Sequence, residues 1–306
     1  MIFCLMLTNI FTACGAQNLT AQNSTVQKEA QPVSKSFFAE TVALNSGYTM
    51  PRFGYGTWTL NNDEADAYVW HALKIGYRLI DTAQYYGNEV GVGRAVRSAI
   101  KDGIATREEI FVTSKILPSS DPDAAIDKSL NALGLDYIDL MLVHQPGYND
   151  EETYRALERA VKAGKVRSIG ISNYYTPQEF DRIRNIATIV PAVVQNENHP
   201  FYQNAEFKSY VEQFGTVVES WYPLGGRGNT QEIFADETIQ QLAKKYSKSP
   251  AQIVLRWQFQ DGYIAIPGSK NRGHITENFD IFNFRLTEED MNLMRGLNRN
   301  HRFENW

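Results

Sequence analysis

A regular alternation of short β-branched runs with longer helical patterns, from about residue 37 onward, is the feature that most constrains the fold of this chain. This alternation is typical of repeated βα units around a parallel sheet. Several short runs are almost continuously apolar, as expected of strands that are covered on both faces. The predicted strands are residues 53–58, 77–81, 110–114, 138–143, 168–171, 192–196, 216–219 and 263–266.

Helical patterns separate these strands, and many begin with Pro, Asp or Asn in a capping position. They include residues 88–102, 124–133, 152–163, 177–185, 204–213, 238–246 and 250–260. Before the first strand, residues 39–44 and 48–50 flank the turn-prone sequence Asn45-Ser46-Gly47. This arrangement predicts a β-hairpin that closes the floor of a barrel.

Eight strands with intervening helices predict an α/β fold, a (β/α)8 TIM barrel with an N-terminal β-hairpin. Such a barrel needs roughly 250 residues, and the chain has 306. A doubly wound open sheet is the alternative, but no G-x-G-x-x-G turn follows the first strand and no change of composition divides the chain. Gly91 and Gly93 lie inside a helical pattern, so we do not expect a phosphate loop there.

The composition excludes several classes of protein. With 43 % hydrophobic and 21 % charged residues, the chain is neither disordered nor membrane-spanning overall. A formal charge of -5 leaves no basic surplus for a phosphate backbone, so no nucleic acid is expected as a partner. Cys4 and Cys14 both lie near the amino end, so the barrel is expected to contain no disulfide, no cysteine-ligated metal and no thiol nucleophile.

Residues 1–36 are expected to be separate from the barrel of residues 37–306. The apolar start ends in FTACG at 11–15, which is similar to a bacterial lipoprotein cleavage site that would place a lipid anchor on Cys14. No Lys or Arg precedes the apolar stretch, which is shorter than a membrane span, so an untrimmed, disordered leader is the alternative. Residues 17–36 have the polar composition of a solvated linker.

Four polar side chains fall at the carboxyl ends of three neighbouring predicted strands, which form the mouth of such a barrel. The second strand ends in Asp81 and is followed by Tyr86, Lys115 follows the third strand, and His144 follows the fourth. Each alone has an ordinary structural interpretation: a cap, a packed ring, a solvated loop lysine or a hydrogen-bonded wall residue. Their convergence on one mouth favours a catalytic site.

From about residue 37 to residue 303 the chain resembles the aldo-keto reductase family. The similar blocks are MP at 50–51 with GYGTW at 54–58, YRLIDTA at 77–83 with YGNE at 86–89, GISN at 170–173, QNENHP at 195–200, WYPLG at 221–225, IPGS at 266–269 and EN at 277–278. His144-Gln145-Pro146 together with Trp221 is most like the bacterial branch that includes diketogluconate and methylglyoxal reductases.

This resemblance implies NAD(P)H-dependent reduction of an aldehyde or ketone by a tetrad of Asp81, Tyr86, Lys115 and His144. Hydride arriving at a carbonyl carbon places negative charge on the oxygen, which must be protonated as it forms. Tyr86 would be that acid, with its pKa lowered by Lys115. Asp81 would hold Lys115 charged, and His144 would orient the substrate. Trp58, Tyr86 and His144 would bind the substrate.

The cofactor residues also follow from the resemblance. Ser172, Asn173 and Gln195 match positions that hold the nicotinamide carboxamide, and Trp221 matches the ring that stacks on the nicotinamide. The remaining implied contacts are Thr57, Trp58, Asp81, Leu224, Gly226, Ser269, Lys270, His274, Glu277 and Asn278, with Arg227 a further candidate near the pyrophosphate.

The chain departs from the family where the 2′-phosphate of NADPH is usually bound. Gly268 and His274 stand where many members have Lys and Arg. Lys270 or Arg272 would supply charge from adjacent positions. We therefore expect NADPH to be preferred, with appreciable use of NADH.

The expected substrates are small aldehydes, dicarbonyls or keto-sugars. The short carboxyl tail predicts an open pocket. Its apolar wall would consist of Trp58, Tyr55, Trp221, Tyr222, Phe303 and Trp306.

Two other functions are alternatives to a reductase. A non-catalytic nicotinamide-binding, redox-sensing subunit would not need the intact tetrad. A phosphate-sugar isomerase on the same fold would need glycine-rich phosphate loops after strands seven and eight, and no such loops are expected in this chain.

The family resemblance favours a monomer. It also favours a cytoplasmic location, where NADPH is abundant, whereas a lipid anchor at Cys14 would place the protein at a membrane or in the periplasm.

Overall fold

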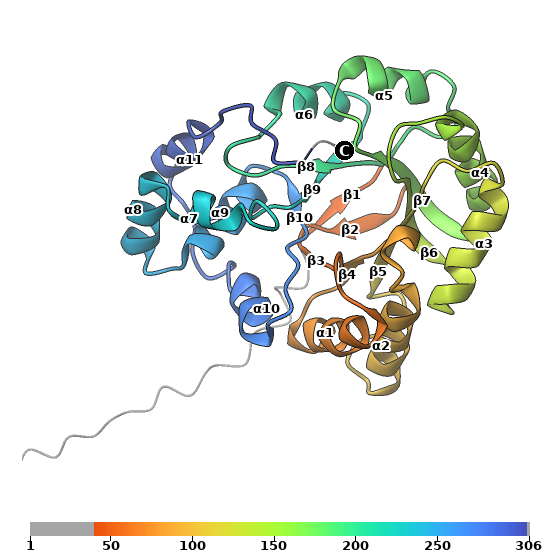
Figure 1. Ribbon diagram of the computed structural model, residues 1–306, viewed down its shortest axis with the longest axis horizontal. Helices are drawn as coiled ribbons and strands as arrows, with labels where there is room; N and C mark the ends of the chain where they lie inside the picture. Colours follow the sequence, from red (N-terminus) through yellow and green to blue (C-terminus); the bar gives the residue numbers. More distant parts are fainter. Residues whose placement is uncertain (1–39, 305–306) are drawn as a thin grey trace, which may run out of the picture. The chain divides into compact units, whose positions relative to one another are not determined.

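The structure is a computed structural model that describes residues 40–304, and it confirms the barrel (Figure 1). Eight parallel strands follow one another around the sheet in chain order. Because the order never reverses, the doubly wound alternative is wrong. The strands are β3 (Gly54–Gly56), β4 (Leu79–Asp81), β5 (Phe111–Ile116), β6 (Ile138–Val143), β7 (Val166–Ser172), β8 (Val193–Glu197), β9 (Val217–Trp221) and β10 (Ile264–Ala265).

The barrel closes between its first and last strands. A parallel bridge joins Phe53 to Ala265, and the backbone N–H of Gly56 donates to the carbonyl oxygen of Pro267 at 3.2 Å. The seam has few bonds because β3 and β10 are the shortest strands of the sheet, together with β4. The remaining neighbours are joined by regular parallel pairing.

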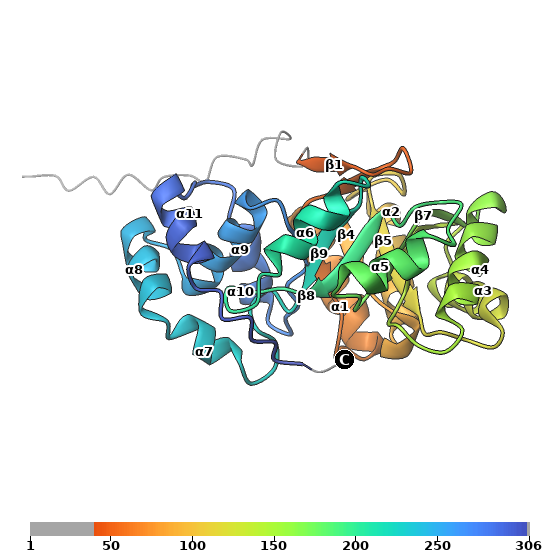
Figure 2. The ribbon, with the colours of Figure 1, turned by 90° about the horizontal axis from the view of Figure 1, so that it is seen from above.

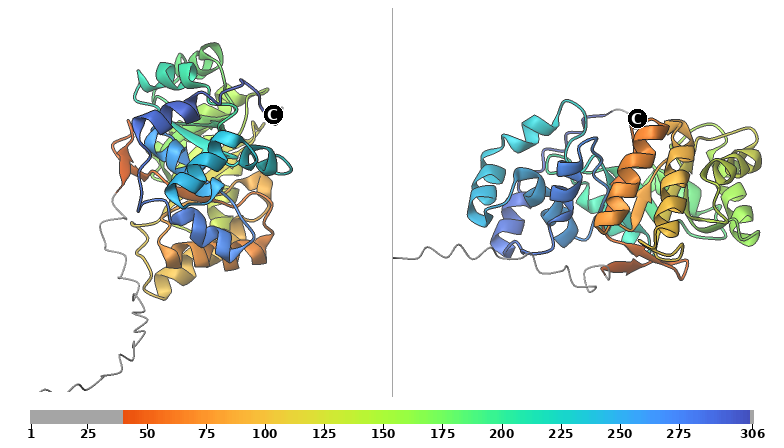
Figure 3. Two further views of the ribbon diagram at one scale, coloured as in Figure 1. Left: turned by 90° about the vertical axis from the view of Figure 1, so that its left-hand side faces the viewer. Right: turned by 90° about the horizontal axis from the view of Figure 1, so that it is seen from below.

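Helices surround the sheet (Figures 1 and 3). They are α1 (Asn62–Ile75), α2 (Glu89–Lys101), α3 (Pro122–Leu133), α4 (Asp150–Lys162), α5 (Pro177–Arg184), α6 (Ala205–Glu212), α7 (Thr230–Phe234), α8 (Glu237–Tyr246), α9 (Pro250–Gln260), α10 (Arg272–Phe279) and α11 (Glu288–Arg295), with a 3₁₀ turn η2 (Gln84–Tyr86). The predicted helical ranges match α2 to α6, α8 and α9 within two residues, whereas α1, α7, α10 and α11 lie outside them. Across residues 40–304, no helix has both the length and the apolarity that a membrane span needs.

Local capping explains where several helices begin. At α9, Ser249 accepts a hydrogen bond from the N–H of Gln252, whose side chain accepts one from the N–H of Ser249. Pro250 occupies the first helical position, where its missing N–H costs nothing. The same capping box is repeated at α5 by Thr176 and Glu179. These helix starts are therefore encoded locally.

Gly91 and Gly93 permit close packing of α2 against its two neighbours. A Cβ atom on Gly91 would lie 2.0 Å from the carbonyl oxygen of Asn62 at the start of α1, and one on Gly93 would lie 1.9 Å from that of Leu133 at the end of α3. Both distances are far inside van der Waals contact. These glycines are therefore packing residues, in agreement with the interpretation that they do not form a phosphate loop.

The predicted hairpin is present and covers the floor of the barrel (Figure 2). It consists of β1 (Thr41–Ala43) and β2 (Thr49–Pro51). Its turn is tied to the amino ends of the barrel strands, because Asn45 Nδ2 donates to the Pro191 carbonyl at 3.2 Å and the hydroxyls of Ser46 and Ser168 lie 2.7 Å apart. Met50 is fully buried under the strands.

The barrel interior changes from apolar to polar along its axis. Near the floor, Leu79, Leu140 and Val193 belong to one buried apolar cluster. Two residues later on β4 and β8, the buried interior side chains are Asp81 and Gln195. Since side chains in a strand alternate between faces, these polar residues lie directly above the apolar cluster. A dry, closed floor therefore supports a polar layer at the mouth.

Candidate active site

The structure brings three of the four predicted catalytic groups into direct contact. The ammonium of Lys115 donates to Asp81 Oδ1 at 2.7 Å, to the Thr82 carbonyl at 2.9 Å and to Tyr86 Oη at 3.1 Å. The third strand was predicted to end at Ser114, but β5 continues to Ile116. Lys115 is consequently an interior barrel residue, completely buried, and all three of its donors are used.

Burial and pairing act in opposite directions on this ion pair. Burial alone would lower the pKa of Lys115, but the nearby Asp81 and Tyr86 outweigh it and the pKa is raised. Burial is also the largest influence on Asp81 and raises its pKa, although Lys115 and Gln195 oppose the shift. The contacts with Asp81 and Tyr86 therefore favour the charged form of Lys115.

Tyr86 keeps its proton in this environment. Burial raises its pKa to about 12, and Lys115 opposes this without reversing it. The expected lowering by Lys115 is thus present but is smaller than the effect of burial. Because Tyr86 Oη accepts the Lys115 N–H, its own O–H is left to donate into the cavity that Tyr86 lines.

His144 follows β6 directly and faces the same cavity. Its ring centroid is 5.7 Å from that of Tyr86. Burial and then the charge of Lys115 lower its pKa to about 3, so the imidazole is neutral. Its Nδ1 atom has no hydrogen-bond partner within residues 40–304. A neutral imidazole has one N–H donor, which suits an uncharged carbonyl oxygen.

Nearly all of the predicted site residues line one cavity of about 700 Å³ at the mouth, a volume within the usual range for a small-molecule site. Two do not line it: Lys115 lies beneath, and Thr57 is buried with its hydroxyl donating to the Asp81 carbonyl at 2.9 Å. The predicted residues that line the cavity are Trp58, Asp81, Tyr86, His144, Ser172, Asn173, Gln195, Trp221, Leu224, Gly226, Arg227, Ser269, Lys270, His274, Glu277 and Asn278.

The predicted pocket wall is only partly correct. Trp58, Trp221 and Tyr222 line the cavity. Tyr55 does not, because it is buried and donates its hydroxyl to the Ser269 carbonyl at 2.6 Å. Trp306 and the segment around Cys14 lie outside the described residues. Several lining residues on loops and helix ends were not predicted, because these positions have no local signature: Leu117, Gln145, Thr230, Gln231, Phe234 and residues 249–251.

Asn173 braces two walls of the cavity. Its amide donates to the His144 carbonyl at 2.9 Å, and its Oδ1 accepts the Trp221 indole N–H at 3.1 Å. The backbone of Asn173 is left-handed, with φ of 67°, which Asn tolerates better than most residues. These contacts fix the orientation of the Trp221 ring, the surface predicted to stack on a nicotinamide.

Trp58 forms the opposite edge of the mouth. Its indole N–H donates to Tyr222 Oη at 3.2 Å, so loops that follow β3 and β9 meet across the cavity. The Trp58 ring lies 4.7 Å from that of Tyr86 and stacks with that of Tyr85 at 6.0 Å. Tyr85 is 56 % exposed at the rim, whereas the hydroxyl of Tyr86 reaches inward to Lys115.

A further carboxylate, Glu219, was not predicted as a site residue. The Gln195 amide donates to Asp81 Oδ2 at 2.8 Å and to Glu219 Oε2 at 2.7 Å. Burial raises the pKa of Glu219 to about 8, and the negative charge of Asp81 adds to this shift. Glu219 occupied the last position of the predicted strand 216–219, so the strand-end criterion that selected Asp81 could have found it.

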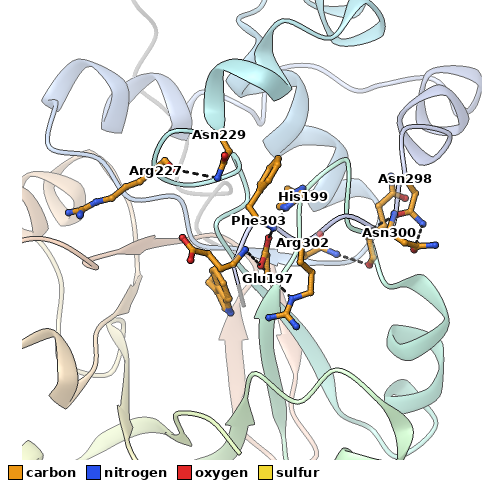
Figure 4. Close-up of polar contacts among 12 residues, drawn as sticks. Glu197, His199, Arg227, Asn229, Asn298, Asn300, Arg302 and Phe303 are labelled. Carbon is orange, nitrogen blue, oxygen red and sulfur yellow. Dashed lines mark hydrogen bonds and ion pairs between the residues drawn. The ribbon is translucent and has the colours of Figure 1, made fainter. Parts of the chain in front are cut away.

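A separate buried carboxylate, Glu197, anchors the carboxyl-terminal segment (Figure 4). It accepts the backbone N–H of Phe303 at 2.6 Å and that of Glu304 at 3.2 Å, and His199 Nε2 lies 3.0 Å from it. The Phe303 ring stacks on His199 with centroids 4.5 Å apart. Phe303 is therefore an anchor rather than a pocket wall, which corrects the sequence prediction.

The end of the cavity predicted to bind adenosine contains an unexpected acidic residue. The Lys270 ammonium contacts both carboxylate oxygens of Glu64, at 2.9 and 2.8 Å. Arg272 and His274 are exposed nearby on α10. Lys270 is the cation nearest in sequence to Gly268, where many family members have Lys. Glu64 therefore partly neutralises the charge expected to replace that lysine. No group of metal-ligating side chains occurs in the described part of the chain.

Comparison with known proteins identifies the family. The Aldo/keto reductase family matches residues 52–299. The chain belongs to this family. It is 38 % identical over 304 residues to the NAD(P)H-dependent D-xylose reductase I,II of Candida tropicalis, with 86 % of this chain and 94 % of that protein covered. It is 41 % identical over 269 residues to the glyoxal reductase of Bacillus subtilis, with 86 % and 94 % covered.

Solved structures of this family agree. An aldo/keto reductase from Brucella melitensis superposes with a TM-score of 0.79 at 41 % identity, covering 84 % of this chain and 97 % of that one. An aldo-keto reductase from Bombyx mori in complex with NADP gives 0.80 at 35 % identity, covering 87 % and 94 %. The predicted family resemblance is confirmed, while the bacterial branch is supported only by relatives such as the glyoxal reductase.

Proposed function

We propose that this aldo/keto reductase uses NADPH, and less readily NADH, to reduce small aldehydes, dicarbonyls or keto-sugars to alcohols, with Tyr86 as the general acid. The observation that carries the proposal is the contact of the buried Asp81–Lys115 pair with a protonated Tyr86 that opens onto the cavity. The family membership and the reductases among its relatives support the reaction class.

The side chains of the mouth suit a carbonyl oxygen that gains negative charge. When bound, the nicotinamide supplies the hydride, and the protein supplies position and electrostatics. Tyr86 donates its hydroxyl proton to the oxygen, and Lys115 stabilises the resulting phenolate across the 3.1 Å contact. His144, held neutral, donates a second hydrogen bond that orients the carbonyl. Asp81 keeps Lys115 charged throughout.

The residues present fit a nicotinamide dinucleotide. Both donors of the Gln195 amide are taken by Asp81 and Glu219, so its Oε1 remains to accept from a carboxamide. Trp221 is already braced by Asn173. The cavity extends to Ser269 and Asn278, which gives room for an extended ligand. We also propose that the protein acts as a monomer on a small-molecule carbonyl.

The direct test uses the full chain with NADPH or NADH and a panel that contains methylglyoxal, glyoxal and xylose. Oxidation is followed by the loss of nicotinamide absorbance. We expect robust turnover, which Tyr86→Phe should nearly abolish because the ring remains and only the acid is removed. Tyr85→Phe is the matched control, since it removes a hydroxyl from the neighbouring exposed tyrosine and should retain most of the activity.

The alternative, a redox-sensing subunit without catalysis, makes the opposite prediction. In that case the protein would bind NADPH but oxidise it with no aldehyde of the panel, and Tyr86→Phe would change nothing. A preference for NADH of about tenfold or more would overturn the proposed order of cofactors. Where the protein resides in the cell depends on the segment around Cys14, and mass spectrometry of the native amino terminus would decide it.

A further inference from the structure

Glu219 is a buried titratable group that the proposed mechanism does not use. It lies on β9 with a relative exposure of 0 %. One carboxylate oxygen accepts from the Gln195 amide at 2.7 Å. The other, Oε1, has no hydrogen-bond partner among residues 40–304. A charged oxygen left in this state would be costly, because neither water nor a donor solvates it.

The surrounding charges leave no counterion for an ionised Glu219. The charged groups that act on it are Asp81 from β4 and Lys115 from β5. The neighbouring strand β8 contributes only the neutral amide of Gln195, and β10 pairs with β9 through Ile264 and Ala265. Lys115 already uses its three donors on Asp81, Tyr86 and a backbone carbonyl.

Asp81 and Glu219 also lie close to each other. Both accept from one amide nitrogen, so their oxygens are on the order of 5 Å apart. Two carboxylates at this distance in a dry interior cannot both ionise without a large cost. Asp81 has the ion pair with Lys115 and keeps its charge, and the proton consequently belongs to Glu219.

We propose that Glu219 is a positioning residue that carries a proton in the resting protein and, together with Asp81, fixes the orientation of the Gln195 amide. With both N–H groups of the amide directed at the two carboxyl groups, its Oε1 is the atom presented to the cavity. An amide turned by half a rotation would place its oxygen against Asp81, which cannot donate. The consequence for nicotinamide binding rests on the proposed function, whereas the protonation of Glu219 does not.

The protonation is tested without cofactor or substrate. Infrared spectroscopy of the full-length protein should show the band of a buried carboxylic acid at neutral pH. The difference spectrum of the parent minus Glu219→Gln should contain this band, whereas that of the parent minus Glu158→Gln should not. Glu158 is the matched control because it is also buried, but one of its carboxyl oxygens accepts backbone N–H bonds at 2.6 and 2.8 Å. A parent spectrum without the band, or a parent-minus-Glu219→Gln difference spectrum without it, overturns the proposal.

The positioning role is tested by NADPH binding, followed through quenching of the fluorescence of Trp58 and Trp221 in the cavity wall. Glu219→Gln keeps a neutral acceptor for Gln195, so its dissociation constant at neutral pH should stay within about threefold of the parent. Glu219→Leu removes the acceptor at similar volume and should weaken binding about tenfold, which corresponds to one lost buried hydrogen bond. Circular dichroism confirms that each variant is folded.

The pH dependence separates positioning from a purely structural role. NADPH affinity of the parent should fall at alkaline pH together with the loss of the carboxylic acid band, whereas Glu219→Gln should not show this fall. Equal weakening in the Gln and Leu variants would contradict the proposal. If the leucine variant does not fold, the infrared band and the glutamine variant still decide. Failure of the proposed function is distinguishable, because it would leave a protein that has the band and binds NADPH but reduces no carbonyl.

Discussion

Replacing Lys115 by methionine tests the electrostatics of the site most directly. Methionine keeps a long side chain but removes the ammonium that contacts Asp81, whose side chain is only 3 % exposed. Breaking a buried ion pair by removing one partner costs about 3–5 kcal/mol, because the remaining charge has no counterion. Asp81 would keep only the Gln195 hydrogen bond. We therefore expect Lys115→Met to lose about 3–5 kcal/mol of unfolding free energy at neutral pH.

The loss of unfolding free energy in Lys115→Met should be smaller in acid than at neutral pH. Burial already raises the pKa of Asp81 despite Lys115, and without Lys115 the rise must be larger. A carboxyl whose pKa is raised on folding stabilises the folded protein while it is protonated and loses this contribution as the pH rises through the folded pKa. The difference in stability between parent and Lys115→Met should accordingly shrink in acid. Urea unfolding at several pH values measures it.

A double mutant separates charge from catalysis. Asp81→Asn combined with Lys115→Met leaves a neutral, similarly shaped pair and should recover most of the lost stability. It should not recover reduction, because Tyr86 still lacks the ammonium. The reasoning is refuted if Lys115→Met stays within about 1 kcal/mol of the parent at all pH values, the range of an exposed ion pair, or if Asp81→Asn gives no recovery.

Three other expectations follow from the structure. His144→Gln should lower kcat/KM about a hundredfold with little change in the free energy of unfolding. Since the pKa of His144 is about 3, the activity of the parent should not fall through protonation of His144 near neutral pH. A decrease in kcat/KM of less than about threefold, or an activity midpoint near pH 6.5 that vanishes in the variant, would contradict this. Glu64→Gln removes the carboxylate that pairs with Lys270 but keeps the capping box of α1. The ratio of NADPH affinity to NADH affinity should therefore rise about fivefold. An unchanged ratio would mean that Lys270 does not reach the 2′-phosphate. Because the folded pKa of Glu219 is raised to about 8 from 4.5, the parent should lose stability relative to Glu219→Gln as pH rises across that interval; parallel unfolding profiles would exclude the shift.

The fold was predictable because its signals are local and repeated. Each barrel strand is a short apolar run, and each βα unit adds another copy of the same pattern. Boundaries were less certain, and the case of Lys115 shows why. Pairing with β6 carries β5 two residues past the predicted end at Ser114. That extension depends on a partner strand more than 20 residues away rather than on the sequence of β5 itself.

The helix α1 was missed for another reason, since alanines such as Ala65 and Ala72 form much of its buried face and give a weak hydrophobic periodicity.

The site residues divide along the same line. Asp81 and His144 stand at strand ends and could be found from their positions, whereas Tyr86 lies in the turn η2 and was chosen through the family resemblance. The Glu64–Lys270 contact joins residues 206 positions apart, and no local pattern predicts it. Phe303 was assigned to the pocket because an aromatic tail suggests a wall, yet the buried Glu197 holds its backbone elsewhere. Long-range polar contacts between side chains are therefore what the sequence could not supply.

The mouth of the barrel presents neutral donors to the cavity although it is built on buried charges. The Lys115 ammonium is directed at Asp81 and at the oxygen of Tyr86 rather than at the cavity. Burial raises the pKa of Tyr86 and lowers that of His144, so both groups face the cavity uncharged. Neutral donors bind an uncharged carbonyl oxygen weakly, and the bonds strengthen as negative charge develops during reduction. In the proposed reaction, Lys115 stabilises the phenolate of Tyr86 across their 3.1 Å contact as it forms.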